Sequence, residues 1–196
     1  MNKLMISVLT AGSMIALAAP AAAQSTPPVT GTVNILGSVA PKCFVVPGAG
    51  SSFERTVNFN ELAAADGTLR TGLAAEFATA GVSARVVCTS GNAAISVDSD
   101  PITAATATAG VTGYDNSIDF TAHVAVTTTT GPAGPFNNDS AAAPLVASPV
   151  GGRLANNGSD NILITADNFR TNATGDLLVA DPVYSGKITV VIAPSA

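Results

Sequence analysis

The sequence predicts an all-β protein folded as an antiparallel sandwich, on two observations. Short segments throughout the chain alternate apolar and polar side chains, which is the period of a strand with one buried face. Clusters of Gly, Asn, Pro and Asp that favour turns separate these segments, and strands do not alternate regularly with helices. The composition agrees, because Thr, Ala, Ser, Asn, Gly and Val dominate and Trp is absent.

Strand patterns recur through the body of the chain, at 55–62, 81–88, 94–97, 117–126, 161–169 and 184–192. Segment 117–126 is typical, because its apolar residues share one parity: Ile118, Phe120, Ala122, Val124 and Val126. Only 60–67 and 73–81 are predicted to hold a helical turn. The run from Thr127 to Pro149, rich in Ala, Thr and Pro, is predicted to be a long loop with a weak strand inside.

Residues 1–23 are predicted to be a secretory signal peptide. Lys3 precedes an apolar stretch from Leu4 to Ala19, and Ala21–Ala23 supplies an A-x-A cleavage site. The stretch is too short for a membrane anchor, and no other segment has transmembrane length, so we expect no membrane insertion. Removing residues 1–23 leaves 173 of the 196 residues, enough for one domain. The remaining chain has seven basic and 13 acidic residues. This net negative charge disfavours nucleic acid as a partner.

The two cysteines, Cys43 and Cys88, are most simply one disulfide in an oxidising compartment. Two free buried thiols are the alternative. Closing a loop of about 45 residues would stabilise the fold by roughly 4 kcal/mol in the chain-entropy model.

No set of residues predicts catalysis, a cofactor or a metal, and we expect a binding or structural protein rather than an enzyme. His123 is the single histidine and lies opposite the apolar parity of its segment, which predicts a solvent-facing strand residue. The acidic pairs at 98–100 and 115–119 lack the spacing of a calcium loop and are interpreted as turn-capping acids.

A further strand pattern stands before the first cysteine, in "PVTGTVNILGSVAPKCFV". Its apolar parity carries Val29, Gly31, Val33 and Ile35, and its polar parity carries Thr30, Thr32 and Asn34. An exposed strand of this kind invites pairing with other chains. The alternative is an edge strand of the protein's own domain.

This stretch resembles the mature N-terminus of chaperone–usher major pilins, and is similar to the archaic branch known as the spore coat protein U family. The likeness continues in "RTVNFNELAAADGT", "ARVVCTSGNAAISV" and "DPVYSGKITVVI", whereas 103–158 does not align. The resemblance implies an immunoglobulin-like sandwich that lacks its last strand and is completed by a donor strand from a neighbouring subunit. It implies donor residues 24–36, with Val29, Gly31, Val33 and Ile35 facing the groove, and a pilin domain at 37–196 whose first strand starts near Gly37.

The resemblance also implies partners and a location. The partners would be identical or related pilin subunits, a periplasmic chaperone and an outer-membrane usher. The chain would pass through the periplasm to a surface pilus that supports adhesion and biofilm formation. The alternative is a secreted or tip-located adhesin or sugar-binding module without catalysis.

Overall fold

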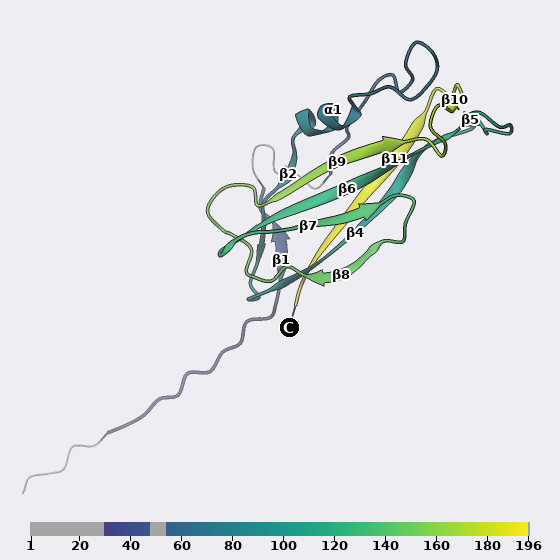
Figure 1. The fold of residues 1–196 in the computed structure, drawn as a ribbon. Helices are drawn as coiled ribbons and strands as arrows, with labels where there is room; N and C mark the ends of the chain where they lie inside the picture. The colour runs from purple at the N-terminus through teal and green to yellow at the C-terminus, as the bar shows by residue number, and fades with distance from the viewer. Residues whose placement is uncertain (1–29, 48–53, 196) are drawn as a thin grey trace, which may run out of the picture. The chain divides into compact units, whose positions relative to one another are not determined.

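A computed structural model describes residues 30–47 and 54–195, and strands dominate it (Figure 1). The chain divides into two units, Met1–Gly37 and Ser38–Ala196. The elements of the second unit are, in order, β1 (Cys43–Val45), α1 (Leu73–Ala80), β2 (Val82–Ala84), β3 (Val86–Cys88), β4 (Ala93–Ala104), β5 (Tyr114–Asp115), β6 (Ser117–Thr128), β7 (Gly131–Asp139), β8 (Leu145–Pro149), β9 (Ile162–Arg170), β10 (Leu177–Leu178) and β11 (Tyr184–Pro194).

The strands form two antiparallel layers. The first layer has the order β7-β6-β9-β2, and β3 follows β2 along the chain and pairs with β1. The second layer has the order β11-β4-β8. The layers join where β4 and β6 pair at Ile102–Ile118 and Thr103–Ser117. The predicted all-β antiparallel sandwich is therefore confirmed, with one small parallel pair, β5–β10, added at its end.

The core lies between the layers. It is formed largely by the apolar side chains of the alternating segments that the sequence predicted to be strands. The five apolar residues of one parity in β6 are at most 3% exposed. The inward residues of β2 and β3 are buried as well: Val82, Ala84, Val86 and Cys88. Of the two predicted helical turns, the second is a helix, α1, which ends at Gly81 in the left-handed conformation, with φ 61°.

A buried asparagine, Asn161, fixes the position of β3. Its side-chain oxygen accepts a hydrogen bond from the Val86 N–H at 2.8 Å, and its amide nitrogen donates to the Val86 and Ala155 carbonyls at 2.7 Å each. The side chain thus replaces the backbone partner that β9 no longer supplies beyond β2. This holds β3, which carries Cys88, in position to pair with β1.

Three predictions about strand positions are wrong. Segment 55–62 forms no strand, and Asn60 has a left-handed φ of 57° that interrupts an extended chain. Val57 and Phe59 still pack against the core. The alternation of apolar and polar residues indicates which side chains are buried, but it does not indicate whether the backbone pairs with another strand. The first strand of the sandwich begins at Cys43 rather than near Gly37.

The third error concerns the segment from Thr127 to Pro149, which contains two strands, β7 and β8, instead of a long loop. Its glycines and prolines suggest a loop, since proline has no N–H to donate to a ladder. Among the described residues, however, both strands pair along one edge only, and proline is tolerated on an edge strand.

Candidate functional site

The sandwich has two seams where the outermost strands of its layers come together. One seam lies between β7 and β8, and the other between β1 and β11 (Figure 1). Within the part of the chain that the structure describes, β1 pairs only with β3 and β11 only with β4. Each of these two strands therefore leaves one edge unpaired along the second seam.

The β7–β8 seam is closed by a buried polar side chain. Asn138, on β7, accepts a hydrogen bond from the Ser99 N–H of β4 at 2.7 Å. Its amide nitrogen donates to the Ala143 carbonyl, just before β8, at 2.8 Å. These bonds join the two layers, so the core is covered on this side.

The β1–β11 seam leaves the core partly uncovered. Val190 and Ile192 of β11 stand opposite Val97 and Ile95 of β4 in the ladder and share their face. Val97 and Ile95 are 0% exposed, whereas Val190 and Ile192 are only half-buried. The four side chains are aliphatic and have the same orientation, so the difference arises because no strand of the described residues pairs with the outer edge of β11.

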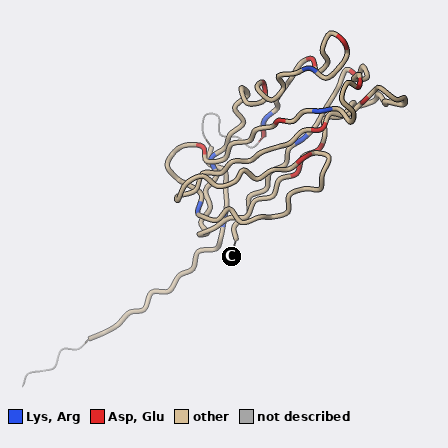
Figure 2. Tube along the Cα trace, in the orientation of Figure 1, with Lys and Arg blue, Asp and Glu red and all other residues tan. Residues whose placement is uncertain are grey.

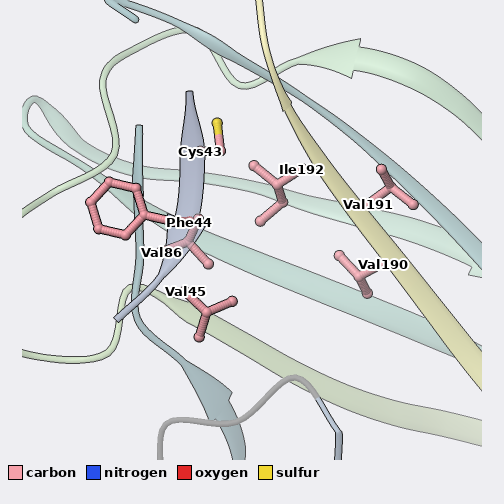
Figure 3. Close-up of a pocket in the computed structure, with 7 residues that line it drawn as sticks. All are labelled: Cys43, Phe44, Val45, Val86, Val190, Val191 and Ile192. Atoms are coloured by element: carbon pink, nitrogen blue, oxygen red, sulfur yellow. The ribbon is translucent and has the colours of Figure 1, made fainter. Parts of the chain in front are cut away.

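An apolar groove of about 270 Å³ follows this seam (Figure 3). Its lining comes from three strands: Cys43, Phe44 and Val45 of β1, Val86 of β3, and Val190, Val191 and Ile192 of β11. None of these side chains is charged, and the flanking edges of β1 and β11 offer unpaired backbone groups. The groove can therefore bury apolar side chains and pair an extended backbone at the same time.

A disulfide fixes one wall of the groove. Cys43 and Cys88 are directly opposite each other in the β1–β3 ladder, with Cα atoms 4.1 Å apart, and their sulfur atoms are bonded. This confirms the predicted pairing and excludes the alternative of two free thiols. Because β1 is three residues long, the bond ties a short strand to the sandwich.

The predicted donor residues lie in the first unit of the chain, and Val29 lies outside the described residues, as do 1–23. Residues 30–42 form no strand, and nothing lies within 4 Å of the space beside Gly31. Val33 is 87% exposed and Ile35 is 92% exposed. Residues 30–41 carry no charged side chain (Figure 2). The described part of the predicted donor, residues 30–36, is thus neutral and forms no strand.

His123 lies on the outer face of β6, opposite the core as its parity predicts. Its Nδ1 is 2.8 Å from Asn137 Oδ1 on β7, and its Nε2 is 2.8 Å from Asp167 Oδ1 on β9. Partial burial favours the neutral ring, but the hydrogen bonds to Asp167 and Asn137 and the charge of Asp167 outweigh it and raise the pKa of His123. Both contacts are acceptors, so they favour an imidazolium that links three strands.

Replacing His123 with Gln is expected to destabilise the protein at about pH 5.5 and to have little effect near pH 9. A folded-state pKa raised above the unfolded value stabilises fully below the unfolded pKa, and this stabilisation is lost as pH rises through the folded pKa. Near pH 9, where the ring is neutral, a change to Ala should cost less than about 0.5 kcal/mol, as at an ordinary surface site. Urea unfolding at both pH values measures this. An equal effect at both, or a hydrolase activity abolished by the change, would contradict this account.

The acidic pairs do not gather into a site. Asp115 accepts hydrogen bonds from the Ser117 and Asn172 N–H groups at 3.0 and 2.6 Å, which confirms its interpretation as a turn-capping acid. Asp98 and Asp100 lie within β4 and Asp119 lies within β6, so that interpretation is wrong for these three residues. In residues 30–47 and 54–195, no group of three or more His, Cys, Asp or Glu residues has the arrangement of a metal site.

No helix among the described residues is both long enough and apolar enough to span a membrane. Comparisons of the chain with protein-family models, with curated proteins and with solved structures found no match. The class of protein is therefore defined by its fold and by the geometry of the groove. It is an antiparallel β-sandwich cross-linked by one disulfide, with one closed seam and one open apolar seam.

Proposed function

We propose that this chain is a structural subunit of a chaperone–usher surface pilus that polymerises by donor-strand exchange. The N-terminal segment of one copy fills the β1–β11 groove of the next. The observation that carries the proposal is the unequal burial of matched pairs, with Val97 and Ile95 at 0% exposure and their partners Val190 and Ile192 half-buried. An added strand along β11 would cover this exposed part of the core.

The N-terminal segment has the chemistry that the groove requires. Val33 and Ile35 lie on the same parity as Gly31 and are almost fully exposed. The core-facing residues of β11 follow the same period of two, at Ile188, Val190 and Ile192. Burying one β-branched side chain stabilises by roughly 1.5–3 kcal/mol, and pairing with the free edge of β11 would satisfy its backbone groups. We assign donor residues 24–36 on this basis.

Such a junction propagates, because the donor and the groove are different surfaces of one chain. A contact of this kind is heterologous and, where the rotation does not close a ring, extends into a fibre. Assembly by a periplasmic chaperone and an outer-membrane usher, and a role in adhesion and biofilm formation, follow from the resemblance of "PVTGTVNILGSV" to the pilins. The proposal therefore places the working protein on the cell surface.

Deleting residues 24–36, or replacing Val33 with Asp, is expected to abolish polymers while leaving a domain that can cap a fibre. A charge buried without a partner in an apolar groove is costly. The measurement is polymer laddering on gels of unboiled samples, comparing each variant with the unaltered chain.

Replacing Asn34 with Asp is the matched control. It adds the same charge to the adjacent residue on the opposite parity, which would face solvent, so the ladder should remain. If the deletion instead unfolds a stable monomer, the segment belongs to its own domain and the proposal is wrong. An unchanged ladder after either donor change would also contradict it.

A further inference from the structure

The β7–β8 seam also presents strand edges, and its prolines lie at particular positions on them. In the described part of the chain, both strands are paired along one side only, β7 with β6 and β8 with β4. Pro132 and Pro135 belong to β7 and Pro149 to β8. Pro135 lies in the bulge between the pairs Val124–Phe136 and Val126–Ala133, whereas Pro132 and Pro149 each have a partner in a ladder. An unpaired edge of this kind is a template for a strand of another molecule.

The nitrogen of Pro132 faces the free edge of β7. Pro132 stands opposite Thr127 of β6 in the ladder. Thr127 uses its backbone on the other side of β6, where its N–H donates to the Asn161 carbonyl and its carbonyl accepts from the Ala155 N–H. A residue opposite such a position in an antiparallel pair is not hydrogen-bonded to it, so its own nitrogen points away.

The same reasoning applies to Pro149 on β8. The next residue, Val150, donates its N–H to the Ala93 carbonyl of β4 at 2.8 Å. Since successive backbone N–H groups of an extended strand point to opposite sides, the nitrogen of Pro149 points away from β4. Both prolines thus replace a donor on the free edges of the seam.

We propose that Pro132 and Pro149 prevent a second copy of this chain from pairing at the β7–β8 seam. A strand added there would leave its own carbonyl groups without donors at both positions, which disfavours the pairing. The edges of the β1–β11 seam keep their backbone donors, because β1 contains no proline and β11 has one only at its last residue, Pro194. Copies therefore join through the groove and do not associate side by side. The inference rests on the proposed function only in naming the groove as the junction.

The test replaces Pro132 and Pro149 with Thr, singly and together, in a full chain that also carries Val33→Asp. The groove is supplied with an excess of a synthetic peptide of residues 28–39. Sedimentation velocity over a range of protein concentrations should show monomers for the Val33→Asp chain and dimers and larger species once the prolines are replaced. Pro182→Thr is the matched control, because Pro182 is exposed in a loop outside the strands, and it should leave the monomer unchanged.

The outcomes separate this inference from the proposed function. A Val33→Asp chain that polymerises, or a peptide that does not bind, contradicts the donor-strand proposal, while the comparison with Pro182→Thr still tests the seam. Variants of Pro132 and Pro149 that keep their melting curve and remain as monomeric as the control would overturn the inference. So would loss of the fold in both single variants, since the prolines would then serve the strands themselves.

Discussion

Replacing Cys43 and Cys88 together with Ala is expected to lower the free energy of unfolding by about 4 kcal/mol, because the disulfide closes a loop of about 45 residues in the unfolded chain. Alanine is chosen because Cys88 is buried, and a serine there would add a buried hydroxyl. Urea unfolding of the oxidised chain and of the double variant measures the difference. Adding a reductant to the unaltered protein should reproduce it.

The same variant should also lose the groove. The strand β1 has three residues and, among the described strands, pairs with β3 alone, in a ladder whose first pair is Cys43 and Cys88. Without the covalent bond, this short ladder has to hold one wall of the groove unaided. We therefore expect polymer laddering to fall further than stability alone predicts. A double variant that unfolds at the urea concentration of the unaltered chain and still forms ladders would refute both expectations.

The second large effect is expected on the groove side of the junction. Replacing Val190 with Asp places a charge among apolar side chains, which should prevent strand addition while leaving the N-terminal segment intact. Alone, this variant should not polymerise. Mixed with the Val33→Asp chain, which has an intact groove and a defective donor, it should form a dimer and nothing larger.

The mixture makes this test specific, because each variant supplies the part that the other lacks. Native mass spectrometry of the mixture, with one chain isotopically labelled, should detect only the mixed dimer. Val146→Asp is the matched control, since Val146 is exposed on β8, away from the groove, and this variant should still polymerise. Circular dichroism melting checks the fold, and Ile192→Asp provides a second groove variant. Mixed samples that stay monomeric although both chains are folded would rule out donor-strand exchange.

The sequence by itself determined the elements whose evidence is local. Alternation of period two predicted the inward residues of β6 and of segment 81–88 correctly, because the period reflects which side of a strand is buried. It predicted 81–88 as one strand, whereas the structure divides it into β2 and β3. The disulfide could be predicted because the sequence contains two cysteines, so each has one possible cysteine partner within the chain. The pattern at Val29–Ile35 predicts a segment suited to pairing, and Val33 and Ile35 are exposed in the structure.

Only the tertiary structure decided which edges are open. Val97 and Val190 have the same side chain and the same parity, yet one is fully buried and the other is not. The difference arises because β4 pairs with both β11 and β8, whereas β11 pairs, among the described residues, with β4 alone. Pro132 and Pro149 suggested a loop in sequence, although they lie on strands whose free edges tolerate them. Asn161 and Asn138 carried no sequence signal, since their hydrogen-bond partners are distant in the chain. Pairing depends on neighbours across the fold, and a local pattern does not contain that information.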